Sequence, residues 1–265
     1  HKDSFGWECK KKVGMIPEVF TGNLVQDVEP ICGSFIACLA VISGQGHIVD
    51  PQAYISELMK VFFQNGGKFV NAKVEDFRFQ NEKISSVHTD IGNFECDKAI
   101  VTAGIWSKEL MLKLGINIPL EAERGYHVVY KNASILPRNP MMMTVGKFGV
   151  TPMGGDLRCA GTVELGGIKL GPSKGPIKLL RRRVAEAFPK MYYDKTEEWF
   201  GFRPTVPDSL PLIGQLKESG VYTAFGHQHI GMTSGPKTGR LIADIINQRS
   251  PNIDISVYDP NRYNL

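Results

Sequence analysis

Two stretches near the end of the chain decide how this sequence is interpreted: GFRPTVPDSLPLIG at residues 201–214 and GHQHIG at residues 226–231. In the first, Arg203 precedes Pro204, which favours an extended backbone at a strand end. A guanidinium placed there can bind a carboxylate through two parallel hydrogen bonds. In the second, glycine lets the backbone approach a flat ligand closely. The helix that follows offers unpaired N–H groups to an anion or an electron-rich carbonyl.

Each stretch also has a purely structural interpretation. Arg203 could form a surface salt bridge with Glu197, Glu198 or Asp208. The glycines at 226, 231, 235 and 239, the last three spaced by four residues, could serve close packing of a helix on a sheet. The residues by themselves leave both interpretations open.

Composition excludes several classes of protein. The 265 residues, 42% hydrophobic and 22% charged, predict one large or two modest globular domains. A net charge of +4 is too small to indicate nucleic-acid binding. The longest apolar run, residues 31–43, is shorter than the ~18 residues that span a membrane. Five scattered cysteines without a Cys-x-x-Cys pair indicate a reducing compartment, and we expect a cytoplasmic protein, with peripheral contact at an inner membrane left open.

Other catalytic patterns are absent from the sequence. The six histidines and their neighbours complete no metal-ligand spacing, so we expect no metal. No Gly-x-Ser-x-Gly elbow indicates a serine nucleophile. The run GMTSGPKT at residues 231–238 has the wrong spacing for a phosphate loop.

Hydrophobic periodicity gives the expected elements of the first half. Residues 1–45 are expected to be irregular, with Pro17 and Pro30 among them. Asp50 and Pro51 begin a helix that Gly66 and Gly67 end. Short strands at 68–71, 74–79, 84–89 and 94–96 form an antiparallel meander, followed by a buried strand at 98–104 and a helix at 107–114.

In the second half, the strands expected are 124–131, 147–152, 157–163, 197–204 and 221–225. One helix covers 177–188, and another runs from about 233 to 248 with Pro236 in its first turn. The pattern predicts a mixed α/β fold. Helix–strand segments at 46–118 and 197–265 alternate with a strand-rich stretch between them, which indicates two interleaved domains.

The order of the motifs is more specific than any one of them. VDP at 49–51, GG at 66–67, IVTAGIWS at 100–107, ERGYH at 123–127 and AGTVE at 160–164 precede the two C-terminal stretches. In this order the sequence resembles the FAD-dependent D-amino-acid oxidase superfamily, in particular its bacterial D-amino-acid dehydrogenase branch, from about residue 20 onward. The resemblance implies an incomplete glutathione-reductase-like FAD domain (46–118 and 197–265) interleaved with a mixed β-sheet substrate domain (1–45 and 119–196).

The resemblance also implies roles for individual residues. Arg203 would hold the substrate carboxylate, and Tyr126, His127 and Thr162 would face the pocket. His229 stands where related glycine oxidases carry a second arginine, so it is a candidate for substrate contact. The residues expected at the cofactor are Thr102, Ala103, Gly104, Trp106, Gly226, His227, Gln228, Ile230, Gly231, Met232 and Thr233.

By the same resemblance, the function expected is FAD-dependent oxidative deamination of D-amino acids, with hydride passing from the substrate Cα to the flavin. No residue is expected to act as a dedicated acid or base, because the cofactor carries the hard step. The electron acceptor, a quinone or another, is left open. The alternatives are a sarcosine- or glycine-oxidase-like amine oxidase and a non-catalytic, truncated subunit.

The sequence departs from the family at its front. Family members begin with a strand, a Gly-x-Gly-x-x-Gly turn and a helix that hold the FAD pyrophosphate. No such motif occurs in these 265 residues. We therefore expect a C-terminal piece of a longer or naturally split enzyme that, on its own, binds FAD weakly or not at all and is inactive.

Overall fold

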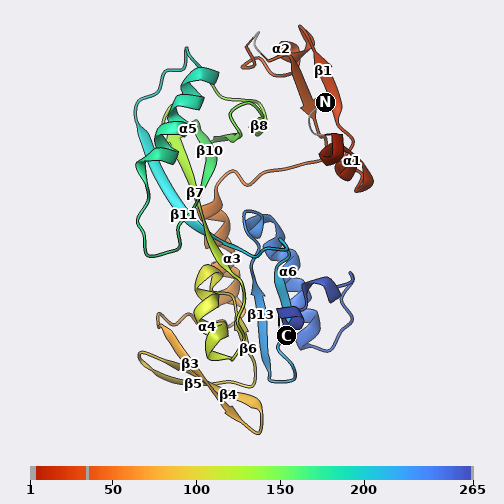
Figure 1. Ribbon diagram of the computed structural model, residues 1–265, viewed down its shortest axis with the longest axis vertical. Helices are drawn as coiled ribbons and strands as arrows, with labels where there is room; N and C mark the ends of the chain where they lie inside the picture. The colour runs from red at the N-terminus through yellow and green to blue at the C-terminus, as the bar shows by residue number, and fades with distance from the viewer. Residues whose placement is uncertain (1–3, 34–35, 264–265) are drawn as a thin grey trace. The chain divides into compact units, whose positions relative to one another are not determined.

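The computed structural model describes residues 4–33 and 36–263. The chain divides into two compact units, each assembled from segments that lie far apart in the sequence (Figure 1). The first unit comprises His1–Gly67, His127–Thr162 and Gly175–Trp199, and the second comprises Lys68–Tyr126, Val163–Lys174 and Phe200–Leu265. These units are defined by packing alone, so the division into FAD and substrate domains at residues 46, 119 and 197 stays a prediction.

The first unit opens with regular elements where the sequence predicted irregular chain. They are α1 (Ser4–Lys12), β1 (Glu18–Thr21), α2 (Leu24–Val28) and β2 (Cys38–Val41). Strands β1 and β2 pair antiparallel, with Glu18 opposite Val41 and Thr21 opposite Cys38. The expectation for residues 1–45 was wrong because Pro17 and Pro30 fall just outside these short elements rather than inside them.

The long helix α3 (Pro51–Gln64) confirms the helix predicted from Asp50. The Asp50 carboxylate accepts a hydrogen bond from the backbone N–H of Ala53 at 2.9 Å, and Pro51 occupies the first helical position. Gly66, with φ of 83°, follows the helix in the left-handed conformation that glycine adopts without strain. The strand predicted at 68–71 was wrong, because those residues join no sheet ladder.

A five-stranded sheet has the order β11-β7-β10-β9-β8. Its strands are β7 (Glu121–Tyr130), β8 (Met141–Met143), β9 (Phe148–Met153), β10 (Asp156–Leu165) and β11 (Thr196–Thr205). All except β8 were predicted. In the first unit, helix α5 (Lys174–Ala187) buries Leu180 and Val184 with Val128, Phe148 and Leu157, which confirms the apolar spacing of that helix.

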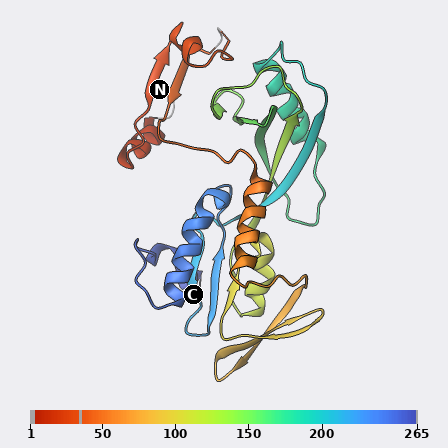
Figure 2. The same ribbon diagram turned by 180° about the vertical axis from the view of Figure 1, so that it is seen from behind.

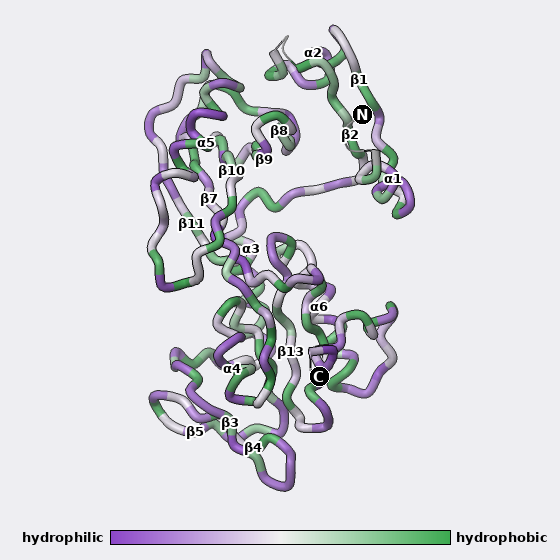
Figure 3. The backbone as a smooth tube through the Cα atoms, in the orientation of Figure 1, coloured by the Kyte–Doolittle hydropathy of each residue, from purple (hydrophilic) through white to green (hydrophobic). Residues whose placement is uncertain are grey.

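The second unit contains the predicted antiparallel meander of β3 (Val74–Gln80), β4 (Lys83–Thr89) and β5 (Gly92–Glu95). Hydrophobic residues are interspersed among hydrophilic ones along its strands, as the colouring in Figure 3 shows. Phe77 and Ile84 are its buried hydrophobic residues, whereas all four residues of β5 are exposed. The meander therefore covers the core with one face only.

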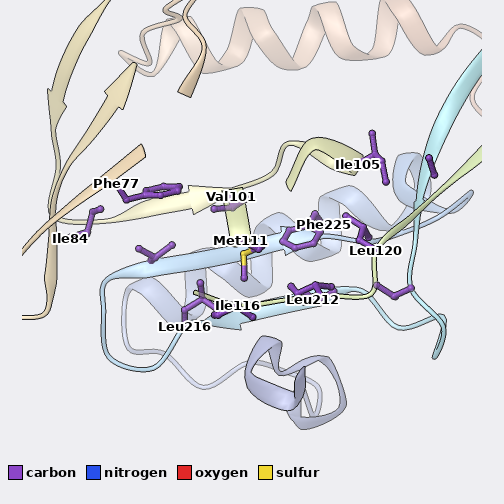
Figure 4. Packing of buried hydrophobic residues seen from close by; sticks show 14 residues of the cluster. Phe77, Ile84, Val101, Ile105, Met111, Ile116, Leu120, Leu212, Leu216 and Phe225 are labelled. Atoms are coloured by element: carbon purple, nitrogen blue, oxygen red, sulfur yellow. The ribbon is translucent and has the colours of Figure 1, made fainter. Parts of the chain in front are cut away.

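Next to it, a three-stranded sheet has the order β12-β13-β6, with β12 (Leu212–Gln215), β13 (Val221–Phe225) and β6 (Ala99–Val101). The 3-10 turn η1 (Gly104–Trp106) and helix α4 (Ser107–Lys113) follow β6. Val101, Met111, Leu212 and Phe225 meet in the core of this unit (Figure 4). Two further 3-10 turns, η2 (Ser256–Tyr258) and η3 (Pro260–Tyr263), lie near the end of the chain.

Helix α6 (Gly231–Ile246) packs on β12 and β13, where Leu241 and Ile242 join Ile213 and Tyr222 (Figures 1 and 2). The helix was predicted, but it begins at Gly231 rather than near Thr233. Pro236 therefore lies inside the helix and not in its first turn. An interior proline has no N–H to donate, so α6 lacks one backbone hydrogen bond in the turn that begins the helix.

Candidate functional site

Two of the turns singled out in the sequence lie at one edge of the three-stranded sheet. Strands β6 and β13 run parallel, with Ala99 opposite Val221 and Val101 opposite Thr223. Because parallel strands end at the same edge, the turn that begins at Thr102 and the turn that begins at Gly226 leave the sheet side by side. This edge, outside the carboxyl ends of parallel strands, is where open α/β sheets bind ligands.

The Arg203 segment lies at the same edge. The backbone N–H of Gln228 donates a hydrogen bond to the carbonyl oxygen of Pro204 at 3.2 Å. The ring of Trp106 meets the ring of Phe202 edge to face, with 6.5 Å between centroids. The structure therefore brings together, within the second unit, three segments that the sequence suggested separately: Thr102–Trp106, Arg203–Pro204 and Gly226–Thr233.

The Arg203 guanidinium is held by strand β7. Its Nη1 donates to Oε1 of Glu123 at 2.8 Å, and the Thr205 hydroxyl donates to the other Glu123 oxygen at 3.2 Å. The guanidinium lies against Gly125, where an added Cβ would stand 2.5 Å from the Arg203 Cζ. The partner is thus Glu123, none of the three acids considered from the sequence.

Those three acids have other partners. Glu197 pairs with Lys195, Glu198 pairs with Arg181, and Asp208 pairs with Arg262. None of them competes for the Arg203 side chain.

Tyr126 belongs to a second cluster, built on the other face of β7. Its hydroxyl donates to the carboxylate of Glu164, which also accepts from Arg124 at 2.7 Å. Arg124 donates to the carbonyl oxygens of Gly167, Leu170 and Gly171 as well, so it ties down the loop that follows β10. The hydrogen bond from Tyr126, aided by the charge of Arg124, lowers the pKa of Glu164.

Alternation along β7 explains the two clusters. Successive side chains of a strand point to opposite faces, so Glu123 and Gly125 meet Arg203 while Arg124 and Tyr126 meet Glu164. Tyr126 is only 2% exposed, and its hydroxyl also accepts from the backbone N–H of Ser173 at 3.2 Å.

His127 and Thr162, both expected at the pocket, belong to the first unit. The His127 ring stacks on Trp199 with 4.9 Å between centroids and lies 3.1 Å from the Arg158 guanidinium. Burial, together with the charge of Arg158, lowers the pKa of His127 to about 4. Thr162 has a φ of 65°, at the point where β10 passes from the first unit to the second.

The turn before α6 is anchored by His227, whose Nε2 lies 2.8 Å from the Thr238 hydroxyl within the helix. Burial lowers the pKa of His227. Gln228 adopts a φ of 52°, and its side-chain amide nitrogen is buried without a hydrogen-bond partner among the described residues. His229, Ile230, Met232 and Thr233 are exposed at the mouth of the helix, next to Gly231.

In the part of the chain that the structure describes, no side chain caps the start of α6. The first N–H groups of a helix have no partner within it, so those of Gly231 and Met232 are available to a ligand. The Thr233 and Ser234 hydroxyls instead donate to the carbonyl oxygen of Ile230, at 3.0 and 2.8 Å.

Thr102 and Ala103 line a cavity of about 350 Å³ between β6, the meander and Leu110 of α4.

Sequence reasoning named Arg203 but gave no role to Glu123 or Gly125, although both stand in the ERGYH motif. The signal that points to them is strand register, because they precede Arg203 by about 80 residues and meet it only across paired strands. Strand pairing is not encoded locally.

The comparison with protein families decides the membership of this chain. The model of the FAD dependent oxidoreductase family, DAO, matches residues 3–245. The chain belongs to this family. FAD is the cofactor of the family, and the resemblance inferred from the motif order is confirmed.

Curated relatives agree with that membership. The chain is 34% identical to a D-amino-acid oxidase of Bradyrhizobium diazoefficiens, over 98% of this chain and 63% of the relative. It is 32% identical to a D-amino acid dehydrogenase of Vibrio vulnificus, over 74% of this chain and 48% of the relative. The chain thus spans between about half and two thirds of the length of these relatives.

Solved structures confirm the mixed α/β fold. Glycine oxidase from Geobacillus kaustophilus superposes with a TM-score of 0.85 at 22% identity, covering 96% of this chain and 69% of that chain. L-proline dehydrogenase from P. horikoshii gives a TM-score of 0.81 at 19% identity, over 97% and 71% of the two chains. Within residues 4–33 and 36–263, no helix is long and apolar enough to cross a membrane, and no three potential metal ligands come together.

Proposed function

We propose that this chain carries the substrate-carboxylate and flavin-ring part of an enzyme that oxidises D-amino acids with FAD. The observation that carries the proposal is the hydrogen bond between Gln228 and Pro204, which joins the helix mouth to the strand end that bears Arg203. The names of the relatives, D-amino-acid oxidase and D-amino acid dehydrogenase, support the substrate class.

The residues at the helix mouth fit a flavin. The buried amide nitrogen of Gln228 lacks a partner among the described residues and can donate to a ring carbonyl. An added Cβ at Gly235 or Gly239 would meet nothing within 4 Å, so this stripe of α6 leaves room for a flat ring. The uncapped N–H groups and the helix dipole favour negative charge at the same place.

In this proposal Arg203 binds and orients the substrate. Its side chain is 27% exposed, and only one of its five N–H donors goes to a described residue, Glu123. The others remain for a carboxylate, which fixes the Cα of an amino acid relative to the ring. When bound, FAD would supply the chemistry, which is the acceptance of hydride from that carbon. No side chain is assigned as acid or base.

The test replaces Arg203 in protein that holds FAD. Arg203→Leu should raise KM for D-amino acids by about two orders of magnitude, since a charged hydrogen-bonded pair is lost, with a smaller change in kcat. Arg182→Leu, at an exposed arginine of the first unit, is the matched control. An unchanged KM in Arg203→Leu rejects the carboxylate role.

A second candidate, an amine oxidase acting on glycine or sarcosine, is favoured by one relative. The chain is 31% identical to a glycine oxidase of Pseudomonas aeruginosa, over 68% of this chain and 50% of the relative. Assays with D-alanine, D-proline, glycine and sarcosine separate the two candidates. Oxygen consumption against dye reduction then separates an oxidase from a dehydrogenase.

A further inference from the structure

We propose that Glu123 and Gly125 are positioning residues that set the orientation of the Arg203 guanidinium before substrate binds. The inference rests on the carboxylate role proposed for Arg203 and names the residues that hold its side chain in place. The three residues are Glu123 and Gly125 on β7 and Arg203 on the paired strand β11, and all three residues belong to the second unit.

Glu123 holds one end of the guanidinium. Its Oε1 accepts from Nη1 of Arg203 at 2.8 Å, while Oε2 accepts from the Thr205 hydroxyl at 3.2 Å. The Glu123 side chain is 18% exposed and therefore partly shielded from water. Because both oxygens of Glu123 are hydrogen-bonded, its carboxylate cannot move with the Arg203 side chain. The position of the carboxylate therefore fixes that of the guanidinium.

Gly125 supports the flat face of the same group. A Cβ at this position would lie 2.5 Å from both Cζ and Nη2 of Arg203 and 2.9 Å from Nη1. Such distances are below van der Waals contact, so any other residue would displace the guanidinium. The plane of the Arg203 guanidinium thus packs against the backbone of β7 at Gly125.

The two supports leave a defined set of donors. The single contact of Arg203 with a described side chain is at Nη1, so Nε and Nη2 are not engaged by side-chain acceptors in the described chain. A carboxylate can bind that edge of the fork through two parallel hydrogen bonds. Because the guanidinium is already fixed, binding avoids part of the entropy cost of ordering a long side chain.

The charge of Glu123 opposes binding, whereas its geometry favours it. Glu123 partly neutralises the arginine and would repel a nearby carboxylate through its own charge. A positioning role therefore predicts that Glu123→Gln, which keeps an acceptor oxygen and removes the charge, retains affinity. Glu123→Ala, which removes both, should lose it.

The experiment measures binding of a simple carboxylate rather than turnover. The Nε–Hε resonance of Arg203 is followed by NMR during titration with propionate, and the resonance is assigned by its absence in Arg203→Lys. Glu123→Ala and Gly125→Ala should each raise the propionate Kd about three- to tenfold, the cost of ordering one long side chain. Glu123→Gln should stay within about twofold.

Glu121→Ala is the matched control. Glu121 lies on the same strand two residues away, is exposed, and among the described residues accepts only from the backbone N–H of Ala122. Its propionate Kd should equal that of the wild type. Thr205→Val, which removes one of the two hydrogen bonds that fix Glu123, gives a milder test if Glu123→Ala does not fold, and should raise Kd by an intermediate factor.

The outcomes separate the two proposals. A wild-type resonance that does not respond to propionate counts against the carboxylate role of Arg203 itself. A response that is the same in wild type, Glu123→Ala and Gly125→Ala overturns the positioning role alone. A purely structural ion pair would lower the denaturation midpoint of Glu123→Ala without changing the Kd, and in protein holding FAD it would leave KM unchanged.

Discussion

The backbone N–H of Gln228 donates to the carbonyl oxygen of Pro204, 3.2 Å away, and this bond joins two segments that β12 and β13 separate in the sequence. Gln228 lies in the turn before α6, and Pro204 directly follows Arg203. Because a hydrogen bond of this length fixes both backbones, the position of the guanidinium and that of the helix mouth are coupled. A substitution in either segment should therefore alter the position of the other.

Substitution of Gln228 tests that coupling. Its φ of 52° lies in the left-handed region, where any residue with a Cβ costs about 1–2 kcal/mol and a β-branched residue costs more. Gln228→Val should therefore lower the free energy of unfolding and weaken FAD binding. Gln228→Gly tolerates the same φ and should keep stability within about 1 kcal/mol.

The two variants are compared by urea denaturation and by titration with FAD followed by fluorescence. Gln228→Gly removes the amide donor without the backbone strain, so weaker FAD binding in this variant assigns the donor to the cofactor. Equal FAD affinity in Gln228→Gly and wild type would show that the buried amide has no part in binding.

The glycine stripe of α6 should separate stability from cofactor binding. Gly239 has open space around an added Cβ and lies inside a helix, so Gly239→Ala should stabilise the protein by about 0.5–1 kcal/mol. The same methyl group should weaken FAD binding if the ring lies on this stripe. Thermal unfolding gives the first quantity and FAD titration gives the second.

The control for the stripe is Gly46→Ala, another glycine with open space, in the first unit. It should leave FAD affinity unchanged. If Gly239→Ala gains stability and binds FAD as wild type does, the ring does not lie over Gly239.

The buried Arg124 should control the loop that follows β10. Its guanidinium donates to three carbonyl oxygens between Gly167 and Gly171 and to Glu164. Lysine has a single ammonium and cannot reach so many acceptors in one plane, so Arg124→Lys should free the loop. Limited trypsin digestion should then cleave at Lys169 faster than in the wild type.

Lys60→Ala is a suitable comparison for that prediction, because Lys60 forms an exposed pair with Glu57, which contributes little. It should not alter the rate of cleavage at Lys169. Resistance of the loop in Arg124→Lys would mean that Tyr126 and Ser173 are enough to hold it.

His127 predicts a dependence of stability on pH. Its pKa is lowered to about 4 by burial and by Arg158, whereas the unfolded chain has a pKa near 6.5. The folded state therefore binds fewer protons, and the stabilisation, complete above about pH 6.5, is lost as pH falls toward 4. Between pH 7 and pH 5 the loss should be about 1 kcal/mol after allowance for solvent at this half-buried ring.

The measurement is the free energy of unfolding of wild type and His127→Gln at pH 7 and pH 5. The drop on acidification should be smaller in His127→Gln, because glutamine does not titrate. Equal drops in the two proteins would show that the His127 ring is protonated as readily in the folded as in the unfolded state.

Local features of the fold were predictable from the sequence. Asp50, Pro51 and Gly66 mark the two ends of α3, and the predicted range of β13 agrees with the structure at both ends. These signals are local, because a cap, a fixed φ and a period of two act within a few residues. The start of α6 was misplaced because Pro236 is accommodated inside the helix, a choice that tertiary packing makes.

By itself, then, the sequence determined the family, the mixed α/β class and the residue types that suit a carboxylate and a flavin. Only the tertiary structure decided which of them meet. Glu123 and Gly125 reach Arg203 through the pairing of strands about 80 residues apart, and Tyr126 turns to the opposite face by one step of the same strand. The physical reason is that register and facing are set by the pairing of distant strands and by burial, which no local run of residues specifies.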